Sequence, residues 1–244
     1  MRLQFVGSGD AFGSGGRFNI CFLVPRGDDS FLIDCGASSM IALRKLGIDP
    51  NTIRTIFVSH LHGDHFGGLP FFILDAQFYS RRKGPLTLIG PTGFGKRLAQ
   101  AMEVFFPGSS TAPRKFETEV LEAAPGETGT VNGIGFRTVG VRHACGAPPL
   151  GLRLECDGRS IAYSGDTEWT DALVDLGKGA DLFIVEALTW DRKIAQHLDY
   201  ASVRENAARI GAKRIVLTHF GPDMLARLPD AGHEHAEDGE VIHF

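Results

Sequence analysis

Cysteine motifs are missing from this sequence of 244 residues. The only cysteines are Cys21, Cys35, Cys145 and Cys156. They are widely spaced and form no Cys-x-x-Cys pair, which excludes a cysteine-based zinc finger. A disulfide framework is not expected in a chain of this length. The apolar share of 43% and the charged share of 22% are ordinary for a globular protein. These values exclude a disordered chain, a collagen and a coiled coil.

Long apolar stretches and an excess of positive charge are missing as well. No apolar run reaches the length that spans a bilayer. Residues 1–7 enter a strand pattern without the apolar region of a signal peptide, so we expect a cytoplasmic protein with no membrane partner. The 25 Lys and Arg residues against 29 Asp and Glu give a net charge of −4. This balance does not favour general binding of nucleic acid.

Glycine is abundant, with 31 residues, and it separates short apolar runs along the whole chain. Strands are predicted at residues 3–6, 20–24, 31–33, 55–58, 86–89, 114–121, 135–141, 150–155, 160–163, 182–185 and 214–217. Helices are predicted at residues 37–46, 69–79, 93–105, 167–176 and 201–210. Both halves pass from several strands to alternating helix and strand, which predicts two mixed sheets packed together with helices outside. We expect one domain over residues 1–244, with residues 107–113 joining the halves.

The strongest chemical signal is the segment 59–68, Ser-His-Leu-His-Gly-Asp-His-Phe-Gly-Gly. Directly after a predicted strand it places His60, His62, Asp64 and His65. Ligands bind in open α/β sheets where strands end, and imidazole and carboxylate are the usual ligands of hydrolytic zinc. A catalytic zinc keeps one position open for water, so four ligands in one loop are more than one ion needs. The segment therefore indicates a site for two metal ions.

Three further candidate ligands each follow a predicted strand. His143, Asp166 and His219 come directly after the apolar runs that end at residues 142, 165 and 218. Taken alone, each has an ordinary interpretation as a surface histidine or a turn aspartate. Their shared position, in the loop after a strand, predicts that they join the ligands of the first segment.

The His-x-His-x-Asp-His segment and the later ligands resemble the signature of the metallo-β-lactamase-fold hydrolases, and the resemblance spans nearly the whole chain. It implies a mixed α/β fold, a four-layer αββα sandwich, with two divalent ions at the sheet edges. Zn²⁺ is the first expectation, with Mn²⁺ or iron as alternatives, because His and Asp ligands suit several metals. On this sequence the resemblance assigns His60, His62 and His143 to one ion, Asp64, His65 and His219 to the other, and Asp166 to a bridge between them.

Within that superfamily the chain resembles the ribonuclease Z-like and phosphodiesterase branch. The segments 5–10, 33–36 and 88–91 match the pattern of this branch, and so does Asn19. His197, shortly before the last ligand, matches a histidine that faces the reacting phosphate in that branch.

The resemblance and the neighbouring residues together predict roles near the metals. The candidate catalytic residues are accordingly Asp64 and His197. Asp34 is expected to support the metal loop, and Asp199 to orient His197. Cys145 is interpreted as a buried filler, and Trp190 is the best aromatic candidate for a pocket wall.

The resemblance implies a dinuclear metal-dependent hydrolase, first of all a phosphodiesterase that uses a metal-bridging hydroxide on small or cyclic phosphodiesters. Processing of tRNA 3′ ends is less favoured, because two predicted strands fill the stretch between His143 and Asp166 and leave no room for a clamping arm. The expected partner is thus a small-molecule substrate and not a folded RNA, and relatives of this kind often form homodimers. The alternatives are a hydrolase of a lactone, thioester or sulfate ester, and a non-catalytic metal-binding protein. The last would predict missing ligands, and none is missing.

Overall fold

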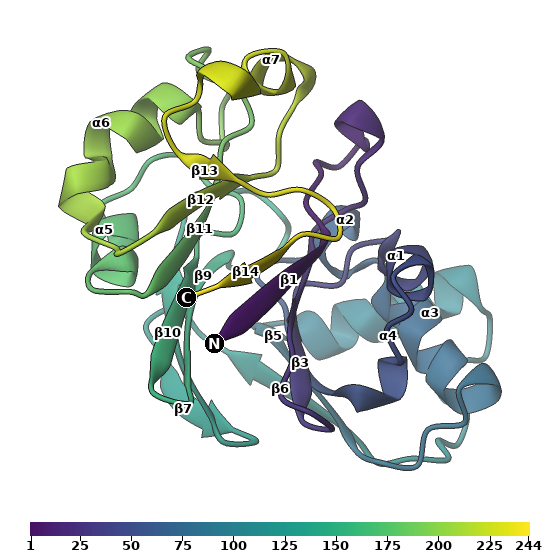
Figure 1. The fold of residues 1–244 in the computed structure, drawn as a ribbon. Helices are drawn as coiled ribbons and strands as arrows, with labels where there is room; N and C mark the ends of the chain where they lie inside the picture. The colour runs from purple at the N-terminus through teal and green to yellow at the C-terminus, as the bar shows by residue number, and fades with distance from the viewer.

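Two seven-stranded sheets pack face to face in the computed structural model, which describes all 244 residues (Figure 1). The first sheet has the order β14 (Val241–His243), β1 (Arg2–Gly7), β2 (Cys21–Val24), β3 (Ser30–Ile33), β4 (Ile53–Phe57), β5 (Leu86–Pro91) and β6 (Thr118–Ala123). The second has the order β13 (Glu234–His235), β12 (Ile215–Thr218), β11 (Leu182–Glu186), β10 (Arg159–Tyr163), β9 (Leu150–Cys156), β8 (Ile134–Gly140) and β7 (Thr128–Val131).

Helices cover the outer face of each sheet (Figure 1). The first sheet carries α1 (Ser39–Lys45), the one-turn α2 (Gly63–Phe66), α3 (Leu69–Leu74), a π-helical turn (Asp75–Tyr79) and α4 (Phe94–Phe105). The second carries α5 (Ala172–Gly177), α6 (Tyr200–Ile210) and α7 (Pro222–Leu225). No helix is at once long and apolar enough to cross a membrane. The four layers confirm the αββα sandwich that the sequence predicts.

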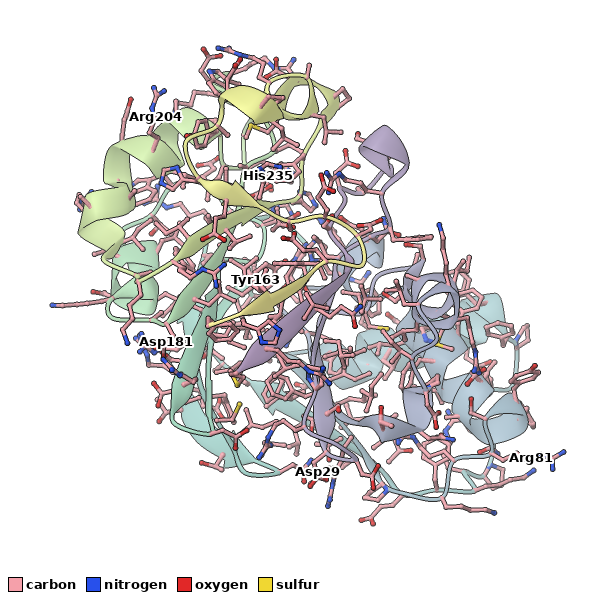
Figure 2. All side chains as sticks on the ribbon, viewed as in Figure 1. Asp29, Arg81, Tyr163, Asp181, Arg204 and His235 are labelled. Carbon is pink, nitrogen blue, oxygen red and sulfur yellow. The ribbon has the colours of Figure 1, made fainter.

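Alternation of side chains along the strands explains this packing, since successive residues of a strand point to opposite faces. In β3, Phe31 and Ile33 point into the core between the sheets, while Leu32 points to the helices. Across the core, the rings of Phe22 and Tyr163 have centroids 5.3 Å apart. Tyr163 lies near the middle of the molecule (Figure 2). Complete burial of each such side chain stabilises the fold by about 1.5–3 kcal/mol.

The chain crosses between the sheets later than the sequence predicts. The strand β6 still belongs to the first sheet, because α4 is a crossover that returns it parallel to β5, with Leu88 opposite Val120. The crossing follows β6 and leads to β7, a largely exposed strand that the apolar pattern missed. The last strand, β14, returns to pair with β1. The predicted join at residues 107–113 is therefore wrong, because that segment lies within the connection between α4 and β6.

One predicted helix begins later than expected. The pattern places its start at Thr167, whereas α5 begins at Ala172. The backbone N–H of Thr167 donates to the carboxylate of Glu186, and that of Glu168 donates to the carbonyl of Arg142. These bonds tie residues 167–168 to neighbouring loops and replace the first helical turn.

The strand directions bring the candidate loops to one edge of the sandwich. In the first sheet β4 runs parallel to β3 and β5, and in the second β10, β11 and β12 are parallel. The strand β8 runs in the same direction as β10, because both pair antiparallel with β9. The segments that follow β4, β8, β10, β11 and β12 are those that carry the predicted site residues.

Candidate metal centre

The structure gathers the predicted ligands into two adjoining groups. Within each group the ligand atoms lie within 4.8 Å of one another. One group is His60, His62 and His143, and the other is Asp64, His65, Asp166 and His219. These are the two sets that the family resemblance assigns, brought together by loops from both sheets.

Asp166 lies between the two groups. Its Oδ2 atom is 3.8 Å from Nε2 of His60 and 3.9 Å from Nε2 of His143. The same oxygen is 3.4 Å from Nε2 of His219, and Oδ1 is 3.3 Å from Nε2 of His65. A carboxylate in this position has an oxygen within reach of both groups, as a bridging ligand requires.

Glycines allow the backbone of the loop after β4 to pack closely against the turn that follows β3. A Cβ atom on Gly36 would lie 2.1 Å from the carbonyl oxygen of Asp64, and one on Gly68 would lie 2.3 Å from that of Gly36. The backbone N–H of Cys35 donates to the carbonyl of His65 across this contact, at 2.7 Å. The short helix α2 then places Asp64 and His65 next to each other on the side that faces the centre.

Most of the candidate ligand histidines have one ring nitrogen held by a neighbour. Nδ1 of His60 lies 3.1 Å from Oγ of Ser59, Nδ1 of His65 lies 2.7 Å from Oδ2 of Asp34, and Nδ1 of His143 lies 2.9 Å from the carbonyl oxygen of Gln196. His219 differs, because its Nδ1 lies 3.4 Å from Glu186 Oε1 without forming a hydrogen bond. Metal-ligating histidines almost always have such a partner on the second nitrogen. The partner fixes the ring and directs the other nitrogen to the centre.

The donor set fits divalent cations. Nε2 of His60, Nε2 of His65 and Oδ1 of Asp166 are buried and have no hydrogen-bond partner. Leaving such atoms unpaired costs about 1–3 kcal/mol each, so they indicate a missing partner. Nε2 of His143 and Nδ1 of His62 are 2.9 Å apart. Two nitrogens bound to one Zn²⁺ at about 2.0–2.1 Å lie roughly 2.9–3.4 Å apart, which matches this spacing.

The buried carboxylates of the centre favour positive charge beside them. Burial opposes protonation of His65 and His219, but Asp166 and Asp64 outweigh it and raise both pKa values well above the ordinary histidine value. Burial lowers the pKa of His60, which has less help from the carboxylates. Burial disfavours the ionised form of Asp166, but the nearby histidines hold its pKa well below the usual range. A divalent ion would supply the positive charge that protonated histidines otherwise provide beside these carboxylates.

His197 lies beside the two groups and is paired with Glu186. Its Nδ1 atom shares a short hydrogen bond with Oε1 of Glu186 and lies 3.9 Å from Oδ2 of Asp166. The His197 side chain is 22% exposed, whereas that of Glu186 is only 1% exposed. Burial lowers the pKa of His197, but the bond to Glu186 and the charges of Glu186 and Asp166 outweigh it and raise that pKa. The pairing therefore favours a protonated imidazole.

The expectation that Asp199 orients His197 is wrong, because the partner of His197 is Glu186. Asp199 instead caps α6, accepting a hydrogen bond from the backbone N–H of Ser202 at 2.9 Å, and pairs with Lys193 at 2.7 Å. Glu186 was missed, although it is the last residue of a strand, β11, whose residues are all buried. A polar residue where a buried strand ends is the same signal that identifies the other candidates.

The two remaining candidates, Trp190 and Cys145, are both buried. Trp190 packs against Tyr200, with ring centroids 4.8 Å apart, and beneath the guanidinium of Arg227. It belongs to the core between the second sheet and its helices, and its role as a pocket wall stays a prediction. Cys145 is buried, and its thiol donates to the carbonyl of Ala147, as a buried filler would.

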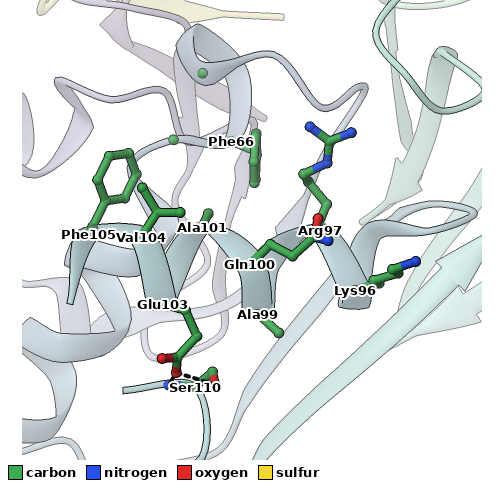
Figure 3. Close-up of a pocket in the computed structure, with 12 residues that line it drawn as sticks. Phe66, Lys96, Arg97, Ala99, Gln100, Ala101, Glu103, Val104, Phe105 and Ser110 are labelled. Atoms are coloured by element: carbon green, nitrogen blue, oxygen red, sulfur yellow. Dashed lines mark hydrogen bonds between the residues drawn. The ribbon is translucent and has the colours of Figure 1, made fainter. Parts of the chain in front are cut away.

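A surface hollow of about 860 Å³ lies between α2 and α4 (Figure 3). Its lining includes Gly63, which lies between His62 and Asp64, together with Gly67 and Phe66, and Phe66 faces α4. On a helix these positions lie opposite Asp64 and His65, since each residue turns by about 100°. None of the candidate ligands lines the hollow.

Comparisons with known proteins agree with this geometry. The sequence profile of the family described as "Anti-Pycsar protein Apyc1" matches residues 1–239. Ribonuclease Z of Mycobacterium bovis is 27% identical, over 91% of this chain and 86% of that protein. The crystal structure of the short form of human tRNase Z superposes with a TM-score of 0.81 and 26% identity, covering 100% of this chain and 99% of that one. A diphosphatase of the PhnP family shares the fold, with a TM-score of 0.77 at 21% identity and coverage of 100% and 97%.

Proposed function

The chain belongs to the family of the anti-Pycsar protein Apyc1, in the ribonuclease Z-like branch of the metallo-β-lactamase-fold hydrolases, and we propose that it hydrolyses small or cyclic phosphodiesters with two metal ions. It is a metal-dependent hydrolase of phosphodiesters. What we propose beyond this is that the substrate is small, that two ions bind, and that the residues have the roles given below. Its main support is that two ligand groups adjoin at Asp166 with the His197–Glu186 pair beside them.

The proposed ligands divide as the two groups do, with Asp166 shared. Two divalent ions there would act as Lewis acids on the phosphodiester oxygens and lower the pKa of a water molecule to roughly 7. Asp34, Ser59 and Gln196 hold the ligand rings in place from outside. The histidine and aspartate donors suit Zn²⁺ first, and Mn²⁺ or iron as well.

His197 is proposed to protonate the leaving oxygen. Its Nδ1 is engaged by Glu186, and no group of the protein bonds to Nε2, which is free to face a substrate. Glu186 keeps the imidazole oriented and favours its protonated form. A positioned acid of this kind contributes typically about 10²–10⁴-fold to a rate.

The stretch between His143 and Asp166 supports a small substrate. It consists largely of β9 and β10, which pair with each other and lie in the middle of the second sheet. No arm projects from it to hold a folded RNA. The names of the relatives, ribonuclease Z and tRNase Z, favour a second candidate function, cleavage at the 3′ end of a tRNA precursor.

Hydrolysis of bis-p-nitrophenyl phosphate by the metal-loaded protein tests the proposal, with p-nitrophenyl sulfate as the control for sulfate esters. A panel of 3′,5′-cyclic mononucleotides and an unprocessed tRNA, each assayed with and without a chelator, then separates the two candidates. Chelator-sensitive turnover of the diester and of a cyclic nucleotide is expected. Cleavage of the tRNA alone would favour the second function, and no diester turnover with two ions bound would refute the first.

The role of His197 is tested separately by His197→Ala. We expect a fall in kcat of at least about 10²-fold, with unchanged metal content measured by elemental analysis. Loss of metal as well would make His197 a ligand. In that case the third cluster of potential donors, Asp166, Glu186, His197 and His219, would be the better description of the site.

A further inference from the structure

Gln196, the residue before His197, makes hydrogen bonds to two other loops of the centre. Its carbonyl oxygen accepts the Nδ1 proton of His143 at 2.9 Å, and its side-chain Oε1 accepts from the backbone N–H of Ala144 at 2.5 Å. Its own N–H donates to Oε1 of Glu168 at 2.6 Å. One residue thus joins the loops after β8, β10 and β11.

The backbone of Gln196 requires this support. Its φ angle is +71°, a left-handed conformation that residues with a side chain seldom adopt. Within residues 191–196, Gln196 alone forms hydrogen bonds outside the segment 189–202, whereas Lys193 bonds back to Asp199 and Ser202. The connection of this part of the loop to the metal side therefore depends on Gln196.

Hydrogen bonds connect Gln196 with the residues on both sides of His143. Glu168, which accepts from Gln196, donates its own N–H to the carbonyl of Arg142, the residue before His143. His143 is thus held through its ring by the Gln196 carbonyl, and its backbone is held on both sides by the same network. His197 follows directly in the chain, and its ring centroid lies 4.9 Å from that of His143.

We propose that Gln196 is a positioning residue that couples metal binding at the His60, His62 and His143 group to the order of the loop that carries His197. A ring that donates Nδ1–H to a carbonyl keeps Nε2 unprotonated for an ion. An ion on Nε2 fixes that ring, and the fixed ring bonds to the carbonyl of Gln196. The side-chain Oε1 of Gln196, which accepts from the N–H of Ala144, keeps that carbonyl beside the ring. By linkage, a loop held in this conformation raises metal affinity to the same extent. The inference rests on the proposed function, in which His143 is a ligand and His197 acts on the substrate.

Hydrogen–deuterium exchange of the peptide that covers residues 188–198 tests the coupling in full-length protein, with and without Zn²⁺. Two variants remove the side-chain bond to Ala144 without straining the backbone. Gln196→Gly accepts a positive φ freely, and Gln196→Asn tolerates it but is too short to reach the same N–H. Gln196→Glu keeps the acceptor oxygen and is the rescue variant. Arg192→Ala, in the same loop, is the matched control, because its exposed side chain forms no hydrogen bond.

In the wild type and in Arg192→Ala, Zn²⁺ is expected to slow exchange of this peptide. In Gln196→Gly and Gln196→Asn most of that protection is expected to disappear, and Zn²⁺ affinity to fall about 10–100-fold, as for other residues that support a ligand. The value of kcat should fall more than KM changes, since a misplaced acid affects the transition state. Gln196→Glu should restore the protection. Thermal unfolding of each variant shows whether it is folded.

The outcomes separate this inference from the proposed function. If the wild type binds two ions and hydrolyses the diester, while Zn²⁺ protects the peptide equally in Gln196→Gly and in the wild type, the coupling is refuted and the proposed function stands. If Gln196→Glu behaves like Gln196→Gly, the side-chain acceptor is not the link, and the inference fails. If the wild type binds no metal at the His143 group, both fail together.

Discussion

Replacement of Asp34 by Asn is expected to weaken metal binding, although Asp34 is not a ligand. Its buried carboxylate accepts three hydrogen bonds. Oδ1 accepts the backbone N–H of Ser59 at 2.7 Å, and Oδ2 accepts Oγ–H of Ser59 at 2.8 Å and Nδ1–H of His65 at 2.7 Å. Asn has the same shape, and its backbone tolerates the φ of +57° found here. The change therefore alters the hydrogen bonding and leaves the backbone in place.

An amide cannot satisfy both neighbours of Asp34. If its oxygen faces the N–H of Ser59, its NH₂ group meets Nδ1–H of His65, and the ring must move its proton to Nε2, the nitrogen that faces the centre. If the amide flips, its NH₂ group meets a backbone N–H that cannot become an acceptor. Loss of such a supporting partner typically costs about 10–100-fold in metal affinity. That range corresponds to about 1.4–2.7 kcal/mol.

Competition with a chromophoric chelator at fixed pH measures this affinity. Asp29→Asn is the matched control, because Asp29 forms an exposed pair with Arg54 at the surface. The control should bind metal as the wild type does. Asp34→Gly, which accepts the positive φ but loses every bond, should bind more weakly than Asp34→Asn. Wild-type affinity in Asp34→Asn, within threefold, would refute the argument that Asp34 fixes the proton of His65.

Three further substitutions test other parts of the structure. Asp166→Ala should lower the content of both ions and abolish diester turnover, because it removes the carboxylate shared by the two groups; full metal retention in elemental analysis would contradict that role. Glu186→Gln should lower kcat by tenfold or more with both ions retained, and an unchanged kcat would show that His197 needs no carboxylate partner. Asp199→Ala should lower the free energy of unfolding by about 0.5–2 kcal/mol, through loss of the α6 cap, in urea titrations of the metal-free protein at pH 7. Burial disfavours the ionised form of Asp199, but Lys193 and the Ser202 N–H outweigh it and lower its pKa, so this contribution is present above about pH 4 and should disappear as pH falls through the folded pKa.

The sequence predicts most of the strands and the candidate ligands that the structure brings together, because both depend on local patterns. Short apolar runs bounded by glycine, proline or aspartate define β3, β5 and β11, and a polar residue directly after such a run marks several of the candidate ligands. His60, Asp166 and His219 were found by this rule alone, before any resemblance was used. Sheet membership was harder to predict. The exposed edge strand β7 has only one apolar side chain, Val131, and the pairing of β6 with β5 depends on where α4 returns the chain.

The residues that hold the ligands could not be found in the same way. Glu186 contacts His197 across the loop between β11 and α6, and nothing in the sequence gives the path of that loop. Asp199 was assigned to His197 because it is close in sequence, yet its side chain turns to the backbone of Ser202. Gln196 supports His143 through a carbonyl oxygen, a group that every residue has, and its side chain bonds only to the backbone of Ala144, so no motif in the sequence marks it.

The two sheets contribute to the centre in different ways, and this explains why one half of the site stands out in the sequence. The loop after β4 carries four candidate ligands and is held by a turn from the neighbouring strand, so its geometry is local. The second sheet supplies its ligands singly, from separate loops that need a common support. The buried carboxylate of Glu186 provides it, since Oε2 accepts the N–H groups of Thr167 and Leu198 while Oε1 meets His197. One carboxylate thereby connects the loop of Asp166 with the loop of His197. Glu186→Gln keeps an oxygen for the two N–H groups, so the loop of Asp166 should stay in place while His197 loses its acceptor.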